Sequence, residues 1–125
     1  MISVTIETKY STALSKNIWH GVSTKTKKKV YSNPKTQAEI DAISWELQSI
    51  RAQDLAWDSG RKIRVDIYAY RPDMGGDIQN FVDTICDGVK WGINVDDNVY
   101  AGSWDWELVK KGEERIVITV SQEPV

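Results

Sequence analysis

Four aspartates in the second half of the chain are of the type and spacing that could bind a divalent cation. Asp77 precedes a helical pattern, Asp83 lies within it, and Asp96 and Asp97 follow it, where a strand is expected to begin. Mg²⁺ prefers oxygen ligands and keeps several waters, so one or two carboxylates per ion are enough. A pair of such ions can activate water and stabilise the leaving oxygen in phosphodiester hydrolysis. The spacing leaves two interpretations open: a metal site, or a helix N-cap at Asp77 and a turn at Asp97.

The apolar pattern predicts the elements that must position these aspartates. Alternating apolar residues at positions 2–6 and 62–70 indicate two strands, and apolar residues three and four apart indicate two helices. Asn33 or Thr36 can cap the first helix, Pro34 suits its first turn, and Asp77 can cap the second helix. The expected elements in order are a strand at 2–7, a polar loop at 9–33, a helix at 34–57, a strand at 62–70, a helix at 77–89, short strands at 93–95 and 98–109, a turn at 110–114 and a closing strand at 116–120.

This order predicts an α/β (α+β) fold, in which a mixed β-sheet is covered by two main helices on one face. The 125 residues suit a single domain, 1–125, and 41% of them are hydrophobic, as in an ordinary folded domain.

We find no apolar run of the ~20 residues that would cross a membrane, and no signal-peptide pattern. Cys86 is the only cysteine, so it has no partner for an internal disulfide, and its place in a helical pattern predicts a small core residue. These features together predict a cytoplasmic protein.

The net charge of −2 conceals an uneven distribution along the chain. Residues 1–71 carry 12 basic and 7 acidic side chains, whereas residues 73–107 carry 8 acidic and 1 basic. A basic part could meet a polyanion while an acidic part holds cations. Chance grouping on a solvated surface is the alternative that the charge pattern leaves open.

One stretch resembles the signature of a known family. The segments GDIQNFVDTICDGVK and VDDNVY resemble the pattern of RusA-type Holliday-junction resolvases, in which a Pro-Asp loop leads into Asp-x-Asp-Asn-x-x-Lys, a helix end and an Asp-Asp pair before a strand. Pro72-Asp73 stands where the family loop begins, and Asp77, Asn80 and Asp87 occupy matching positions. The segment SKNIWHG and the later KKKVYSNPKTQAEIDA match the N-terminal half more loosely. The resemblance covers nearly the whole chain.

The resemblance implies a homodimeric, Mg²⁺-dependent endonuclease, able to use Mn²⁺, that resolves four-way DNA junctions in recombination and repair. Members of this family are often encoded by phages and prophages. By position, the implied catalytic and metal-binding residues are Asp77, Asp97 and the neighbouring Asp96. The residues implied or expected to contact DNA lie in the polar N-terminal loop: Lys16, Asn17, Lys25, Lys27, Lys28 and Lys29. A plain solvated loop is the alternative for these lysines.

Two positions depart from the family pattern. Gln79 stands where the family has a second aspartate, and Asp83 stands where it has a lysine. Gln79 offers a neutral oxygen, and Asp83 cannot stabilise negative charge on a phosphate. Because residues four apart share a helix face, the carboxylate could have moved by one turn, so Gln79 and Asp83 are further candidate metal ligands. The alternatives are a repaired active site and a decayed one, in which case the chain is a DNA-binding protein without nuclease activity.

Overall fold

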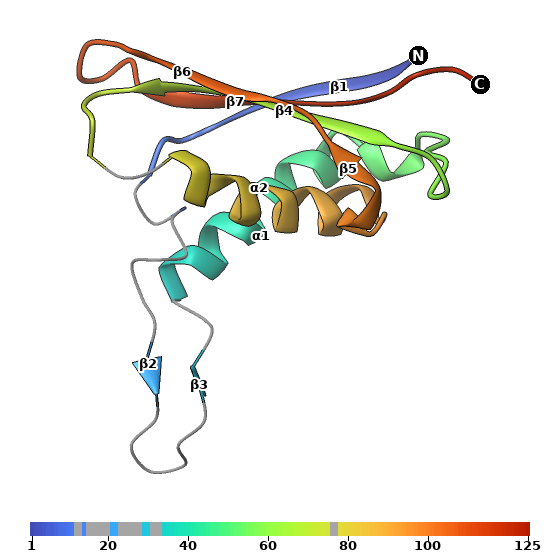
Figure 1. Cartoon of the computed structure of the whole chain (residues 1–125), viewed down its shortest axis with the longest axis horizontal. Coiled ribbons are helices and arrows are strands. Elements are labelled where there is room, and N and C mark those ends of the chain that lie inside the picture. Colours follow the sequence, from blue (N-terminus) through green and yellow to red (C-terminus); the bar gives the residue numbers. More distant parts are fainter. Residues whose placement is uncertain (12–13, 15–20, 23–28, 31–33, 76–77) are drawn as a thin grey trace.

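The computed structural model describes residues 1–11, 14, 21–22, 29–30, 34–75 and 78–125, with 21–22 and 29–30 described by their backbone alone. The fold is mixed α and β: a five-stranded sheet carries two main helices on one face (Figure 1). The predicted fold class is therefore confirmed. No helix among the described residues has the length and apolar character needed to cross a membrane.

The sheet has both antiparallel and parallel pairs. Its strand order is β1-β7-β4-β5, and β6 also pairs with β4 beyond β5. β7 runs antiparallel to both β1 and β4, whereas β5 and β6 run parallel to β4. The strands are β1 (Ile2–Thr8), β4 (Ile63–Arg71), β5 (Tyr100–Ala101), β6 (Trp104–Leu108) and β7 (Arg115–Gln122), with a separate pair β2 (Gly21–Val22) and β3 (Lys29–Val30).

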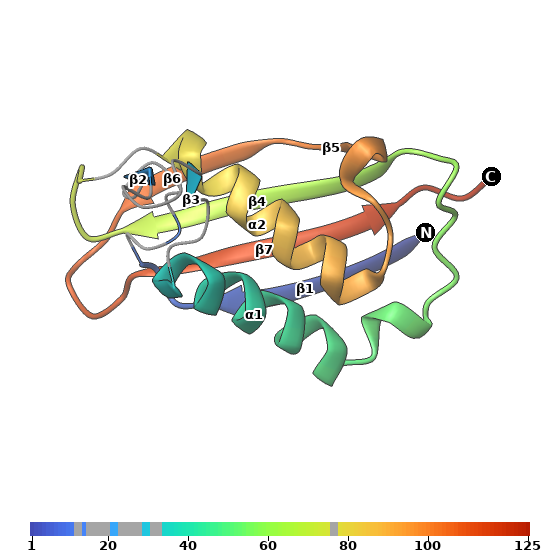
Figure 2. The same cartoon turned by 90° about the horizontal axis from the view of Figure 1, so that it is seen from below.

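The two main helices, α1 (Pro34–Ser49) and α2 (Ile78–Ile93), lie side by side beneath the sheet (Figure 2). Two glycines of α2 allow this close approach. A Cβ atom at Gly88 would lie 2.7 Å from Cβ of Ile43, and one at Gly92 would lie 2.7 Å from Cβ of Leu47. Both distances are shorter than real Cβ contacts, so the absence of a side chain at these positions sets the helix spacing.

Alternation along the strands separates the two faces of the sheet. Every second residue of β4 from Ile63 to Arg71 is buried against the helices. The opposite face carries Tyr68 and Tyr70, whose rings lie 5.0 Å apart, and the Arg115 guanidinium lies 3.9 Å from the centre of the Tyr70 ring. The helices therefore cover one face, and the described part of the other is polar and aromatic.

Several expected boundaries were wrong. The first helix ends at Ser49 and not near position 57, because Arg51 adopts a left-handed conformation (φ 58°) and a short 3₁₀ helix, η3 (Ala52–Asp54), follows. Pro34 does begin that helix, but Thr36 is buried inside it and does not cap it, while Asn33 lies outside the described residues.

The second half of the chain also differs from the expected elements. α2 continues to Ile93, where a strand at 93–95 was expected, because Val89 and Ile93 continue its apolar side into the core. The strand expected at 98–109 is divided into a 3₁₀ helix, η4 (Asp97–Val99), and the strands β5 and β6. Cys86, which the helical pattern predicted as a small core residue, is partly buried and packs against the core.

Candidate functional site

The described candidate residues lie along α2 and in the turn that follows it. Gln79 and Asp83 are exposed on the first half of the helix, and Asp96 and Asp97 are exposed after its end. The opposite side of α2 is apolar and buried, which fixes the polar side toward solvent. A large ligand can therefore reach all four of these side chains.

The two ends of α2 are far apart. At 1.5 Å per residue, Ile78 and Ile93 are separated by about 22 Å along the helix axis. By the same rise, Asp83 lies about 15 Å from the end of the helix that Asp96 and Asp97 follow. The chain then turns back toward α2, so that Tyr100 and Cys86 line one small pocket, and a metal site shared by Asp83 and Asp97 stays a prediction.

Asp77 lies outside the described residues, so its convergence with Asp96 and Asp97 stays a prediction. The described residue beside it, Ile78, begins α2. Among the described residues, no three histidine, cysteine or acidic side chains are grouped closely enough to hold a metal ion. The described side chains thus supply only the pair Asp96 and Asp97 as adjacent carboxylates for a cation at the C-terminal end of α2.

Asp96 already has a cationic partner. Its Oδ1 lies 3.4 Å from the Lys90 ammonium and also accepts a hydrogen bond of 2.9 Å from the backbone N–H of Asp97, which begins η4. The Lys90 side chain, by hydrogen bond and by charge, is the main cause that holds the pKa of Asp96 below its usual value. A metal ion at Asp96 would have to compete with Lys90, a residue that the sequence patterns did not single out.

Behind this carboxylate pair, Tyr100 fixes the turn to the end of the helix. Its hydroxyl donates a 2.8 Å hydrogen bond to the carbonyl of Val95. Burial raises the pKa of Tyr100 well above its usual range, and Cys86 and the two aspartates add to this effect. Tyr100 therefore acts as a neutral donor that holds the backbone before Asp96.

The N-terminal end of α2 is approached through a loop that two side chains hold. The carbonyl of Gly75 accepts hydrogen bonds of 3.3 Å from the Tyr10 hydroxyl and from Nη2 of Arg71. Arg71 is buried at the end of β4, and its guanidinium lies 5.0 Å from the centre of the Trp106 ring. Sequence patterns placed Arg71 only in the break after the strand, although an arginine ending an alternating apolar strand is the signal that could have drawn attention to it.

Trp106 and Trp104 share one face of β6, with unequal burial. Trp106 packs against the core, whereas Trp104 remains 43% exposed.

The candidate DNA-contacting residues Lys16, Asn17, Lys25, Lys27 and Lys28 lie outside the described residues, and the side chain of Lys29 is not described either. Their role stays a prediction from the sequence.

Compared with models of known protein families and with curated proteins, the chain matches none.

Proposed function

We propose that this chain binds branched DNA, in the manner of the RusA-type resolvases that its sequence resembles, and that it cuts such DNA with Mg²⁺ or Mn²⁺. One observation carries the proposal: four polar positions of the resembling motif, 79, 83, 96 and 97, lie exposed along α2 and the turn after it. Exposed carboxylates on one helix and its adjoining turn are accessible to the phosphates and cations of a bound duplex. We place this activity in the cytoplasm and in DNA recombination and repair, in a phage or prophage setting.

The proposal includes a homodimer. The motif's first aspartate, Asp77, precedes α2 in the sequence, while Asp96 and Asp97 follow the helix at its far end. A two-fold pair in which the start of α2 in one copy meets the end of α2 in the other would bring both halves of the motif together. The same symmetry suits a four-way junction, because it directs one site to each of two strands.

A second candidate function is a DNA-binding protein without nuclease activity. The ion pair between Lys90 and Asp96 favours it, because the lysine occupies one of the two described carboxylates. Gln79 favours it as well, because it stands where the family has an aspartate. A neutral oxygen binds Mg²⁺ less strongly than a carboxylate does.

The experiment that tests the proposal is cleavage of a synthetic four-way junction by the full chain, with Mg²⁺ and with a chelator. We expect nicking that needs the cation and disappears in Asp97→Asn, while Asp41→Asn, an exposed aspartate on α1, cuts normally. Tight junction binding without cation-dependent nicking would assign the non-catalytic function. Failure to prefer the junction over a duplex would reject both.

Mixing two inactive variants tests the composite site. If Asp77 and Asp97 act together across a dimer, an equal mixture of Asp77→Asn and Asp97→Asn forms heterodimers with one intact site, and nicking partly returns. No recovery in a mixture that exchanges subunits would mean that the two residues do not form one site across the dimer.

A further inference from the structure

A second surface feature lies at the C-terminal end of α2. The structure has a hollow of about 560 Å³ between the ends of α1 and α2 and the loop after η3. This volume is within the ~300–1,000 Å³ typical of small-molecule sites. It is lined by the exposed indole of Trp91, by Leu55 and Trp57, and by the side-chain amides of Gln48, Gln53 and Asn94.

The lining has a distinctive chemistry. None of the described residues around the hollow carries an ionisable side chain. Trp91 is 63% exposed, so much of its ring is open to a stacking partner. Each carboxamide offers both donors and acceptors of hydrogen bonds. A flat, uncharged ring with donors and acceptors on its edge matches these features, and a nucleobase is such a ring.

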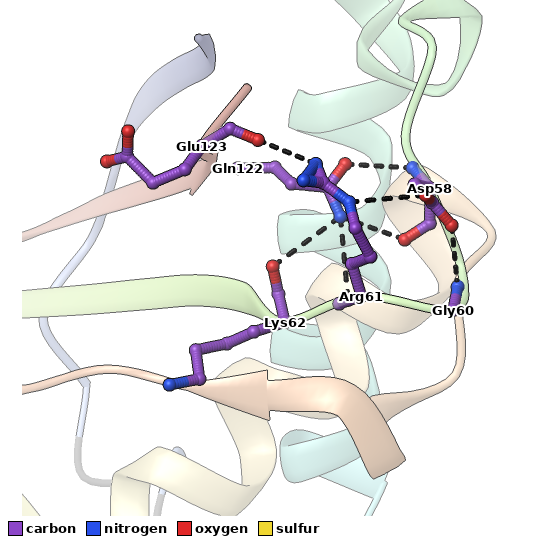
Figure 3. A network of polar contacts seen from close by, with 6 residues as sticks. All are labelled: Asp58, Gly60, Arg61, Lys62, Gln122 and Glu123. Carbon is purple, nitrogen blue, oxygen red and sulfur yellow. Dashed lines mark hydrogen bonds and ion pairs between the residues drawn. The ribbon is translucent and has the colours of Figure 1, made fainter. Parts of the chain in front are cut away.

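Hydrogen bonds hold the residues that line the hollow in place. The Trp57 indole N–H donates to the carbonyl of Ala52 at 2.8 Å. Behind the loop, the buried amide of Gln122 accepts from the Asp58 N–H and donates to the Asp58 carbonyl, both at 2.8 Å (Figure 3). Arg61 joins the same network through the carbonyl of Glu123 (Figure 3). The loop wall is therefore organised before any ligand binds, which lowers the cost of binding.

Cations next to the hollow favour a base that carries phosphates over a neutral sugar. The Lys90 ammonium lies 5.8 Å from the centre of the Trp91 ring, and Arg51 lies in the chain between two amides of the lining. Each pairs with one partly exposed carboxylate, Lys90 with Asp96 and Arg51 with Asp54. Exposed ion pairs of this kind stabilise a fold very little, so a phosphate can replace the carboxylate.

We propose that this hollow binds one unpaired base of a nucleic acid strand, stacked on Trp91 and contacted at its edge by the amides of Gln48, Gln53 and Asn94. The proposal rests on the proposed function, because base pairs next to the branch point of a four-way junction can open and supply such a base. Base–aromatic stacking does not depend on sequence, so the site would recognise the branch and not a particular base.

The chain offers a matched control for the test. Trp45 on α1 is 65% exposed, nearly the same as Trp91, but it does not line the hollow. The full protein is titrated with a short oligothymidylate and with an abasic oligomer of the same length and charge. We expect Trp91→Ala to weaken oligothymidylate binding roughly 10- to 100-fold, as loss of one base stack does, and Trp45→Ala to change it less than twofold. The abasic oligomer should bind all three proteins equally weakly.

A second variant addresses the amides without removing the ring. Gln53→Glu places a negative charge at the hollow and should weaken binding of oligothymidylate more than that of the abasic oligomer. Unchanged near-ultraviolet circular dichroism shows that each variant is folded.

Four results would overturn the proposal: no binding of oligothymidylate by the wild type, equal binding of the abasic oligomer, equal losses in Trp45→Ala and Trp91→Ala, or Trp91-dependent binding of a neutral oligosaccharide in place of DNA. Junction cleavage measured in parallel separates the two proposals. Asp97-dependent cleavage with Trp91→Ala indistinguishable from Trp45→Ala would reject the base site alone. Trp91-dependent binding of oligothymidylate without any preference for junctions would reject the proposed function and keep the base site.

Discussion

The two ends of α2 are built differently. At the C-terminal end, Lys90 pairs with Asp96, Gln48 of α1 reaches the carbonyl of Trp91, and Asn94 closes the helix in a left-handed conformation (φ 60°). In the first half of the helix, Gln79 and Asp83 face solvent. The comparison teaches that positions of one sequence motif can belong to opposite ends of a helix about 22 Å long and so have different surroundings.

The largest effect is expected in the first half of α2. Changing Gln79→Asp together with Asp83→Lys restores the family's charges on one helix face. We predict that junction cleavage rises about 10- to 100-fold, because a charged ligand returns and a cation again faces the scissile phosphate. Cleavage rates of wild type and double variant on one four-way junction check this.

The single change Asp83→Ala distinguishes a decayed site from a repaired one. In a decayed site, Asp83 is no ligand, and Mg²⁺ binding stays the same or improves slightly. Strong wild-type cleavage that is lost in Asp83→Ala and not improved by the double change would show a working, rearranged site.

The next largest effect is expected from removing the hydrogen bonds between the Gln122 side chain and the backbone of Asp58, called here the Gln122 clamp. Gln122 is only 3% exposed and bonds both backbone groups of Asp58. Gln122→Ala leaves those groups without their partners, so we expect it to lower the free energy of unfolding by about 1–3 kcal/mol. Urea denaturation measures this, with Glu123→Ala as the control, because only the backbone of Glu123 joins the network. Equal midpoints for both variants would mean that the clamp adds no stability.

A substitution that disturbs the packing of α2 on α1 should lower the free energy of unfolding by a somewhat smaller amount. An alanine Cβ at Gly88 would lie 2.7 Å from Ile43, whereas one at Gly60 would lie 3.4 Å from the nearest atom. Overpacking of this kind costs about 1–3 kcal/mol, from which the better helix propensity of alanine subtracts up to about 1 kcal/mol. We predict a net loss of about 1 kcal/mol for Gly88→Ala and less than half of that for Gly60→Ala, measured by urea denaturation. A Gly88→Ala protein as stable as wild type would show that the helices separate freely.

The smallest effect concerns the ion pair of Lys90 and Asp96. The folded-state pKa of Asp96 is lowered, so the pair stabilises the fold above the ordinary carboxyl pKa of 3.8 and stops doing so as pH falls through the lowered value. Lys90→Met should return the pKa of Asp96 toward 3.8 and remove this dependence. Carboxyl titration by NMR measures the shift, and an Asp96 that titrates identically in both proteins would contradict it.

The sequence by itself determined much of the fold. Apolar residues at every second position from Ile63 to Ala69, and at Ile116, Ile118 and Val120, predicted two strands with one buried face, because side chains of a strand point to opposite faces in turn. The apolar stripe of Ile78, Phe81 and Ile85 specified a helix against that face. The resemblance selected Asp96, Asp97, Gln79 and Asp83, all of which the structure describes as exposed.

Tertiary structure decided the remaining features, because they depend on contacts between residues distant in sequence. α1 ends early because Arg51 turns the chain into η3, where Ala52 is buried, and no local pattern signalled this. Nothing in the sequence signalled that Gly88 and Gly92 allow α1 and α2 to approach closely, because that depends on Ile43 and Leu47 of the other helix. Spacing gave the order of Asp83 and Asp97 along the chain, whereas the length of α2 and the turn after it determine how the two residues are placed in space.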